Sequence, residues 1–338
     1  MQARRTSGQS TSLDVAALAG VSQPTVSRAL RDDPRIAVAT RDRVHRAAES
    51  LNYVPSQRGR ALSTRTTGRI GVVVGDLGNP FYLQLLELLH AALASASLQM
   101  VVFTDGDNEL EVGQLLDGSI DGVVLTTTVS GSPLVDQLRR RELPIVLLNR
   151  HTDDAETDIC AADNAGGATL VANEFAGLGH TRIGAIFGPQ NTSTGRERQS
   201  GFRHALAARD LTLRDELVRE GEFSFDAGHR ALASLMQKPD PPTAIFCSND
   251  VIALGAINAA RALGVSIPEQ LSLIGFDDIS MAGWEVFALT TVGQNMDGLA
   301  TQAIEQLRLR VETPARPVSR ITVETELVRR GTHGPPQA

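Results

Sequence analysis

Residues 11–30 read TSLDVAALAGVSQPTVSRAL, a stretch rich in hydroxyl side chains. Apolar residues recur three and four positions apart in its first half, which is typical of an amphipathic helix, and Gly20 is suited to ending that helix. Ser22 can cap a second helix, in which Pro24 is tolerated in the first turn. The stretch ATRDRVHRAAESLNY (39–53) predicts a third helix. Two helices joined by a glycine turn and supported by a third form a helix-turn-helix domain.

The second helix of such a domain lies in the major groove of DNA, so its exposed face should match base edges. Gln23 and Arg28 have that chemistry, because glutamine can pair with adenine and arginine with guanine. Ser22, Thr25 and Ser27 are short hydroxyl donors suited to phosphates, which fix the position of the protein rather than the base sequence. An ordinary helical hairpin with a solvated polar face is the alternative that the spacing alone leaves open.

Charge is distributed unevenly along the 338 residues, whose net charge is −7. Residues 1–69 hold 12 arginines against 5 acidic residues, whereas the remainder holds 20 basic against 34 acidic residues. A basic head on an acidic body indicates that one end of the chain meets a polyanion. A composition that is 42% hydrophobic and 21% charged is that of a globular protein with two or three domains.

Several classes of function lack their sequence signatures. No apolar run reaches the roughly 18 residues that a membrane helix needs, and the first 20 residues do not read as a secretory signal, so we expect a cytoplasmic protein without a membrane partner. Cys160 and Cys247 stand far apart without a metal-ligand spacing, so no metal or cofactor is expected. Lys238 is the only lysine, which excludes a GxxxxGK[ST] phosphate loop. Because HExxH, GxSxG and GxGxxG motifs are also absent, we do not expect an enzyme.

Beyond residue 68, short β-branched runs alternate with helical segments, which predicts an α/β domain with parallel sheets. The runs are RIGVVV, LQMVVF, DGVVL, PIVLLN, TRIGAIF, TAIFC and LSLIGF, and each is apolar throughout, as expected of strands covered on both faces. Ligands of such sheets bind beyond the carboxyl ends of the strands, so polar and aromatic residues that follow the runs are candidate ligand contacts. They are Asn79, Phe81, Tyr82, Asp105, Asn149, Arg150, Arg198, Phe223, Asn249, Asp250, Asp277 and Gln294.

Carboxylates, amides, guanidinium groups and aromatic faces together suit a polyhydroxylated ring such as a sugar. The polar groups pair with hydroxyls, and the aromatic rings cover C–H faces. The alternative is that polar residues at strand ends only cap helices and turns, which applies best to Asp105, Asn249 and Asp250. Trp284, the only tryptophan, has two interpretations, a ligand contact or a core residue.

The head resembles the start of a LacI/GalR-family transcriptional regulator. The stretch TSLDVAALAGVSQPTVSRAL (11–30) closely matches the family signature LDVAxxAGVSxxTVSRxL. The likeness continues through LNYVPSQRGRALSTRTTGRIGVVV (51–74). By this resemblance Gln23, Pro24 and Arg28 read bases, with Pro24 limited to apolar contact.

The resemblance also implies a hinge helix at PSQRGRAL, residues 55–62. In the family this helix forms on the operator, pairs with its twin and inserts a leucine into the minor groove, a position held here by Leu62. Such a wedge unstacks a base step and bends the duplex. Gly59 stands where alanine is more usual, and a glycine inside a helix costs about 1 kcal/mol relative to alanine. We therefore place Gly59 and Leu62 among the DNA-binding residues and expect hinge order to depend strongly on DNA.

For the body, the resemblance continues to about residue 331 and implies a periplasmic-binding-protein-like fold with two lobes. The expected divisions are a DNA-binding domain over 1–54, a hinge helix and linker over 55–67, an effector-binding and dimerisation domain over 68–331 and a disordered tail over 332–338. Lobe 1 is expected over about 68–163 and 295–317, and lobe 2 over 164–291 and 318–331, joined by three crossovers.

The resemblance implies the same side-chain types at the strand ends as in ribose-type binders. One departure is Asn149, where an aspartate often precedes Arg150, so the pocket loses one charge. The expected effector-binding residues are Asn79, Phe81, Tyr82, Asn149, Arg150, Arg198, Phe223, Asn249, Asp277 and Gln294.

We therefore expect a homodimeric repressor whose two heads occupy successive major grooves of a near-palindromic operator on double-stranded DNA. A small effector between the lobes, a monosaccharide or related polyol, would change the spacing of the hinges. A purine or nucleoside is the alternative effector. A sugar receptor would leave the basic head unexplained, and an enzyme would need a catalytic constellation that the sequence lacks.

Overall fold

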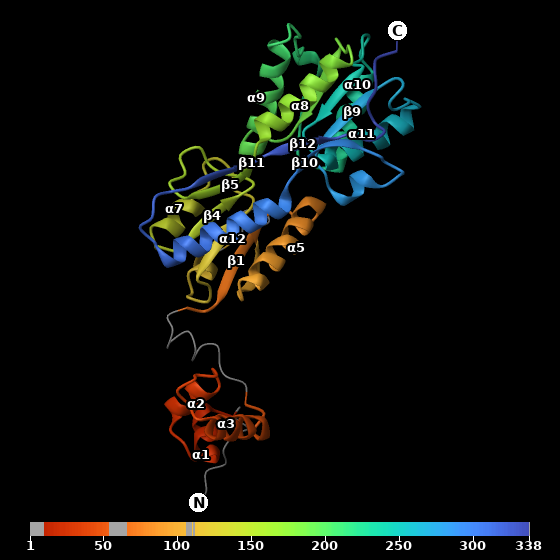
Figure 1. The fold of residues 1–338 in the computed structure, drawn as a ribbon. Helices are drawn as coiled ribbons and strands as arrows, with labels where there is room; N and C mark the ends of the chain where they lie inside the picture. Colours follow the sequence, from red (N-terminus) through yellow and green to blue (C-terminus); the bar gives the residue numbers. More distant parts are fainter. Residues whose placement is uncertain (1–9, 54–65, 106–109, 111, 338) are drawn as a thin grey trace, which may run out of the picture. The chain divides into compact units, whose positions relative to one another are not determined.

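The computed structural model describes residues 10–53, 66–105, 110 and 112–337, and the chain divides into two units, Met1–Thr67 and Gly68–Ala338 (Figure 1). Each unit contains its own cluster of buried apolar side chains. The predicted hinge helix, with Gly59 and Leu62, lies outside the described residues.

The described part of the first unit contains the three predicted helices, α1 (Ser12–Ala19), α2 (Gln23–Ala29) and α3 (Val38–Ser50). Thr11 caps α1 through a capping box, in which its hydroxyl accepts from the Asp14 N–H and the Asp14 carboxylate accepts from the Thr11 N–H. Gly20 ends α1 in the left-handed conformation, with φ 63°. Each helix contributes apolar side chains to one small core, among them Val15, Val26 and Val44.

The caps of the other two helices are weaker than the cap of α1. Ser22 holds the N-cap position of α2, but its hydroxyl lies 2.8 Å from Thr25 Oγ1 and caps no N–H. Ala37 precedes α3 and has no side-chain oxygen to offer. Tertiary packing of their buried faces must therefore stabilise α2 and α3 more than capping does.

The second unit contains two six-stranded sheets that divide it into two lobes (Figure 1). The first sheet has the order β11-β5-β4-β3-β1-β2, made of β1 (Arg69–Val74), β2 (Gln99–Thr104), β3 (Gly122–Leu125), β4 (Ile145–Leu148), β5 (Asp158–Ala162) and β11 (Arg320–Val323). The second has the equivalent order β12-β10-β9-β8-β6-β7, made of β6 (Ile183–Phe187), β7 (Val218–Glu220), β8 (Ala244–Cys247), β9 (Ser272–Asp277), β10 (Thr290–Gln294) and β12 (Thr325–Val328).

Neighbouring strands in both sheets run parallel, apart from the antiparallel pair of β10 and β12 in the described part of the chain. The helices are α5 (Pro80–Ser95), α6 (Val112–Leu115), α7 (Leu134–Arg139), α8 (Asn164–Gly177), α9 (Ser193–Ala207), α10 (Phe225–Met236), α11 (Asp250–Leu263) and α12 (Met296–Glu312). Two short 3₁₀ helices, η2 (Asp215–Leu217) and η3 (Ser280–Gly283), complete the set. None of the helices in the described ranges is long and apolar enough to cross a bilayer.

Both faces of the second sheet are covered, which explains the apolar runs in its central strands β6, β8 and β9. Ile186 of β6 packs in the cluster that includes α10 and α11, whereas its neighbours Ala185 and Phe187 pack in the cluster that includes α8 and α9. Figure 1 shows these two helix pairs beside the strands of that sheet. Side chains alternate between the two faces of a strand, so each face buries its own set.

The lobe boundaries differ from the prediction at two of the three crossovers. Strand β11 pairs with β5 in the first sheet, with Arg320 opposite Ile159, although the second lobe was expected to resume at residue 318. The chain crosses at Glu324, because β12 begins one residue later in the second sheet. Strand β10 also stays in the second sheet as far as Gln294, beyond the expected limit of 291. The local sequence cannot show which sheet accepts the hydrogen bonds of each short strand.

The prediction of a disordered tail is wrong for its first residues. Thr332 is buried, and its hydroxyl accepts from the Thr290 N–H and donates to the Leu273 carbonyl. The Gly334 carbonyl accepts from Ser272 Oγ and contacts His180 Nε2. The start of the tail is held against the second lobe by polar contacts and not by apolar side chains. A prediction from the hydrophobic pattern therefore could not find it.

A buried ion pair joins the end of α12 to the start of β5. Asp158 is fully buried, and both its carboxylate oxygens lie 2.9 Å from donor nitrogens of Arg310. The same carboxylate accepts from the Ser319 N–H at 2.8 Å. The segment between α12 and β11 is thereby held against the first sheet.

Replacing Asp158 with alanine is expected to lower the free energy of unfolding by about 3–5 kcal/mol, because Arg310 would be left partly buried without its counter-ion. Denaturant unfolding followed by circular dichroism measures this. Glu305→Gln is the matched control, since Glu305 forms an exposed ion pair with Arg308 on the same helix and should change stability little. Equal effects of the two substitutions would contradict the assignment.

Candidate functional site

The outward face of α2 carries the residues predicted to read DNA. Ser22, Gln23, Pro24 and Arg28 are exposed, whereas Val26 and Ala29 on the other side of the helix are buried. This division of the helix leaves the polar side chains free to approach a groove.

Contacts within the head organise part of that face. Gln23 Nε2 donates to Ser12 Oγ at 3.1 Å, which ties the start of α2 to the start of α1. Arg31 donates to the Ser27 carbonyl and hydroxyl, while the predicted phosphate donors Ser22 and Thr25 contact each other. These contacts hold the hydroxyl groups of Ser22, Thr25 and Ser27 close to the surface of the helix.

A cavity lies between the two lobes of the second unit, at the carboxyl ends of both sheets. Nine of the ten residues predicted to bind an effector line it, and Thr194 joins them. The lining residues are Asn79, Phe81, Tyr82, Asn149, Arg150, Thr194, Arg198, Phe223, Asn249 and Asp277. Five come from the first lobe and five from the second, so a molecule in the cavity would touch both.

The wall from the first lobe is built by the start of α5. Asn79 is the N-cap, and its Oδ1 accepts from the Phe81 N–H at 3.1 Å. Phe81 and Tyr82 follow directly, and their rings meet edge to face with centroids 5.3 Å apart. One capping interaction therefore fixes both aromatic side chains at the cavity.

The wall from the second lobe centres on a buried ion pair. Arg198 NH1 lies 3.1 Å from Asp277 Oδ1, and Gln294 Nε2 donates to the same oxygen at 2.6 Å. Arg198 also donates to Asn164 Oδ1 at 2.9 Å and to the Ser248 carbonyl at 2.6 Å. Gln294, the tenth predicted residue, thus supports the cavity through Asp277 instead of lining it.

Burial shapes the ionisation of this pair. It lowers the pKa of Arg198, an effect that the charge of Asp277 opposes. It raises the pKa of Asp277, and the charge of Arg198 acts in the opposite direction. The charge of each partner therefore opposes the effect of burial on the pKa of the other.

Backbone strain is concentrated at the same strand ends. Asn149, after β4, has φ 69°, and Asp277, at the end of β9, has φ 118°. Asparagine tolerates the left-handed region, but aspartate at 118° is unusual. Such conformations persist where the surrounding structure imposes them, and they occur frequently at ligand sites.

Arg150 reaches the cavity from the first lobe between two aromatic rings. Its Cζ lies 5.9 Å from the centroid of Tyr82 and 5.2 Å from that of Phe223. Gly188 makes room for the Phe223 ring, since a Cβ at that position would come within 2.2 Å of it. The guanidinium group is thereby in contact with an aromatic ring of each lobe.

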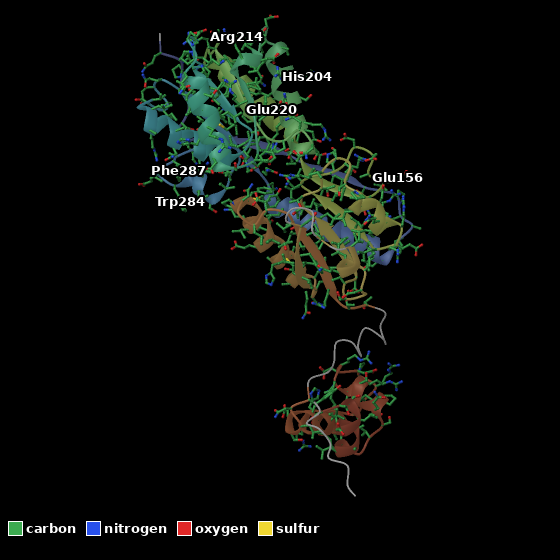
Figure 2. The ribbon with its side chains drawn as sticks, turned by 180° about the vertical axis from the view of Figure 1, so that it is seen from behind. Glu156, His204, Arg214, Glu220, Trp284 and Phe287 are labelled. Atoms are coloured by element: carbon green, nitrogen blue, oxygen red, sulfur yellow. The ribbon has the colours of Figure 1, made fainter. Side chains whose placement is uncertain are left out.

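Other predicted residues have structural roles or lie elsewhere. Asn249 caps α11 through its Oδ1, as the structural interpretation predicts, and it also lines the cavity, so its contact with a ligand stays a prediction. Asp250 is fully buried and hydrogen-bonds to Thr291 and Ile279. Trp284 belongs neither to the core nor to the cavity lining, because it is 54% exposed and stacks on Phe287. Figure 2 shows these two rings together at the surface.

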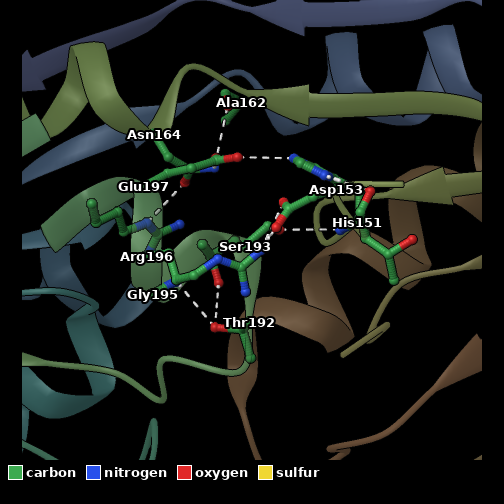
Figure 3. Close-up of polar contacts among 12 residues, drawn as sticks. His151, Asp153, Ala162, Asn164, Thr192, Ser193, Gly195, Arg196 and Glu197 are labelled. Atoms are coloured by element: carbon green, nitrogen blue, oxygen red, sulfur yellow. Dashed lines mark hydrogen bonds and ion pairs between the residues drawn. The ribbon is translucent and has the colours of Figure 1, made fainter. Parts of the chain in front are cut away.

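A network of polar contacts joins the lobes beside the cavity (Figure 3). His151 Nε2 of the first lobe lies 2.9 Å from Glu197 Oε1 of α9, and the other Glu197 oxygen accepts from Asn164 Nδ2 at 2.8 Å. Arg196 pairs with Asp153 at 2.8 and 3.0 Å. Because Asn164 also contacts Arg198, the hydrogen bonds run without interruption from the cavity wall to the first lobe.

Two families match the sequence in complementary regions. Residues 11–56 match the family described as bacterial regulatory proteins, lacI family, and residues 172–333 match a periplasmic binding protein-like domain. The HTH-type transcriptional repressor PurR of Aliivibrio salmonicida is 32% identical over 304 residues, covering 88% of this chain and 91% of that protein. The ribose operon repressor of Escherichia coli (strain K12) is 31% identical over 324 residues, covering 94% and 98%. This chain belongs to the LacI family.

Solved structures of the family agree with the architecture. The transcriptional regulator CelR in complex with cellobiose is 30% identical, with a TM-score of 0.74 and coverage of 96% of this chain and 99% of that chain. The lac repressor dimer bound to operator and the anti-inducer ONPF has a TM-score of 0.86, with coverage of 96% of this chain and 99% of that chain. At 23% identity, this likeness shows the common fold alone. The predicted fold class is confirmed.

As a LacI-family protein, the chain is a ligand-responsive transcriptional repressor and not an enzyme, as predicted. We selected candidate contacts among the polar residues that follow the strands, and the same criterion could have found two further residues of the site. Asn164 comes two residues after the end of β5, at the start of α8, and Thr194 lies in the first turn of α9, the helix after β6. Glu197 and His151 carried no local signal, since their contact joins positions 46 residues apart.

The pair of His151 and Glu197 should make the stability of this LacI-family protein depend on pH. The hydrogen bond to Glu197 raises the pKa of His151. Burial acts to raise the pKa of Glu197, but hydrogen bonds with His151 and Asn164 outweigh it, so that pKa is lowered. The contribution of His151 is complete below the ordinary pKa of 6.5 and is lost as pH rises through the raised value. That of Glu197 is present above 4.5 and is lost as pH falls through the lowered value.

We expect the free energy of unfolding of the wild type to fall relative to that of His151→Gln as pH rises from about 5.5 to about 8.5. Denaturant unfolding of both proteins across this range measures the difference. The comparison cancels the opposite contribution of His180, whose pKa burial lowers. Parallel pH profiles of the two proteins would show that the contact between the lobes is not ionic.

Proposed function

We propose that this repressor binds a near-palindromic operator with an affinity set by a small polyhydroxylated effector, a monosaccharide or related polyol. The observation that carries the proposal is the cavity between the lobes and its mixed lining. Amide, carboxylate and guanidinium groups offer paired donors and acceptors for hydroxyls. Phe81, Tyr82 and Phe223 offer flat apolar surface for the C–H faces of a ring.

Relatives support a sugar effector. The ribose operon repressor and the CelR–cellobiose complex are both similar to this chain over most of its length. The repressors PurR and CytR are similar to the same degree, so a purine or nucleoside stays the alternative effector.

An effector bound there would act by bridging the lobes. It can change operator affinity only by as much as it prefers one arrangement of the lobes over another. A coupling of about 1–3 kcal/mol is typical of such switches. The cavity meets the requirement for differential binding, because Arg150 and Arg198 approach it from opposite lobes.

In the head, α2 is the proposed reading element. Arg28 would pair with guanine, Gln23 with adenine, and Pro24 would make apolar contact. Ser22, Thr25 and Ser27 would contact phosphates, while Gly59 and Leu62 would belong to a hinge helix that bends the operator. A cytoplasmic location is part of this proposal, because a repressor must reach its operator DNA.

A homodimer is the proposed assembly, because a palindromic site requires twofold symmetry. The second unit has exposed apolar side chains at a place that a second copy could cover. Leu83 of α5 is 50% exposed, and Trp284 and Val286 beyond η3 are 54% and 56% exposed. A hydrogen bond between Gln84 and Ser280 joins α5 of the first lobe to η3 of the second, so these exposed side chains belong to segments that are in contact.

Arg28→Ala is expected to remove about 1–3 kcal/mol of discrimination between the selected operator and a scrambled duplex. The operator is first obtained by selection from random DNA, and affinities are measured by fluorescence anisotropy at fixed salt. Arg46→Ala, on the exposed side of α3, is the control and should leave the ratio of the two affinities unchanged. If Arg28→Ala keeps full discrimination, the assignment of α2 as the reading helix fails.

Phe223→Ala is expected to weaken effector binding at least tenfold, because it removes an aromatic face of the cavity. The effector is found by a thermal-shift screen of sugars and polyols, in which a ligand at 100 times its dissociation constant adds about 2.7 kcal/mol. Phe225→Ala is the matched control, since Phe225 is 41% exposed two residues later and does not line the cavity. Equal affinity of both variants would place the effector elsewhere.

A further inference from the structure

The two guanidinium groups at the cavity are not equivalent. Arg198 is fully engaged with groups of its own lobe, the Asn164 amide, the Ser248 carbonyl and the Asp277 carboxylate. Arg150 Nε, in contrast, is buried without a hydrogen-bond partner among the residues that the structure describes. A buried donor on a charged group is costly when it is left unpaired, so a ligand that supplied an acceptor there would gain affinity.

The lining also carries an excess of positive charge. Its charged members, within the described ranges, are Arg150, Arg198 and Asp277. The Asp277 carboxylate lies against Arg198 and accepts from Gln294, so its nearer oxygen is already shared between two donors. One positive charge at the cavity therefore lacks a dedicated counter-ion.

Neighbouring acidic or amide groups do not supply that counter-ion. Asn149, which directly precedes Arg150, is a neutral amide. Asp250 does not line the cavity, and its two oxygens accept from Thr291 Oγ1 at 2.5 Å and from the Ile279 N–H at 2.9 Å. Its carboxylate is thus turned toward its own lobe.

We propose that the effector carries a carboxylate, as a sugar acid does, and that Arg150 binds this group. The inference rests on the proposed function, because it assigns the chemistry of the same effector site. A guanidinium group offers a planar fork of donors that matches a carboxylate. The rings of Tyr82 and Phe223 already hold that fork in place by cation–π contact, so little side-chain freedom remains to be lost on binding.

Charge favours a carboxylate over a phosphate. A carboxylate brings one negative charge, which balances the lining, whereas a phosphate monoester brings about −1.5 to −2 at neutral pH. The phosphate would leave the buried site with an uncompensated negative charge.

Isothermal titration of the full-length protein with matched pairs of ligands tests the proposal. The pairs are D-gluconate with D-glucitol, D-ribonate with ribitol, and D-galacturonate with D-galactose, and D-glucose 6-phosphate is the phosphate arm. We expect the acid of at least one pair to bind at least tenfold more tightly than its neutral partner, and more tightly than the phosphate. Tighter binding of the neutral partners, or of the phosphate, would overturn the proposal.

Variants at the same site test the role of Arg150 directly. Arg150→Gln should abolish the preference for the acid, and Arg150→Lys should retain part of it. Asn149→Asp places a carboxylate beside Arg150 and should shift the preference toward the neutral ligand. Arg203→Gln is the control, because Arg203 pairs with Asp215 on the surface of α9 and should leave the preference intact. Circular dichroism verifies that each variant is folded.

The outcomes separate this inference from the proposed function. If neutral sugars bind well and acids do not, the effector site stands and only the carboxylate is wrong. If Arg150→Gln keeps the full preference for the acid, a different group binds the carboxylate and the proposal fails. If no compound of either kind binds, the polyhydroxylated effector and the carboxylate are both wrong, while operator recognition through Arg28 remains open to its own test.

Discussion

The carboxyl ends of two parallel sheets face one cavity, and the rest of the effector site depends on that constraint. The chain crosses between the sheets after β5, β10 and β11, so neither lobe is a separate segment of sequence. The polar residues at the strand ends of one lobe therefore face the polar residues at the strand ends of the other lobe. Two strained residues, Asn149 directly after β4 and Asp277 at the end of β9, are held in place by the surrounding sheets.

The buried charges around the cavity connect ligand binding with the contact between the lobes. Arg198 is bound to Asp277 at the cavity and to Asn164 behind it, and Asn164 in turn donates to Glu197. Glu197 reaches His151 in the other lobe. A ligand that displaces Arg198 would disturb a set of hydrogen bonds that also joins the lobes. Buried polar networks are sensitive to such losses, because an unpaired group in a low dielectric is costly.

The two units of the chain differ in how they are stabilised and in how they are suited to recognise a ligand. The head has a small core and one strong cap, at Thr11, and carries the excess of basic residues suited to DNA. The described part of the body has three apolar clusters, of which one includes residues of both lobes, and a buried ion pair of Asp158 with Arg310 holds α12 against the first sheet. Recognition of DNA therefore depends on an exposed helix face, and sensing of a ligand depends on an enclosed cavity.

The sequence by itself determined the helix-turn-helix head, the α/β class of the body and most of the cavity lining. Those features follow from local rules, since apolar periodicity defines helices and strands, and a parallel sheet places the residues after its strands at one edge. Only the tertiary structure decided that β11 joins the first sheet and that Thr332 packs against Leu273. It also decided that His151 meets Glu197 and that Arg150 Nε has no partner among the described residues. These outcomes depend on hydrogen bonds between positions far apart in the chain, which leave no periodic trace in the sequence.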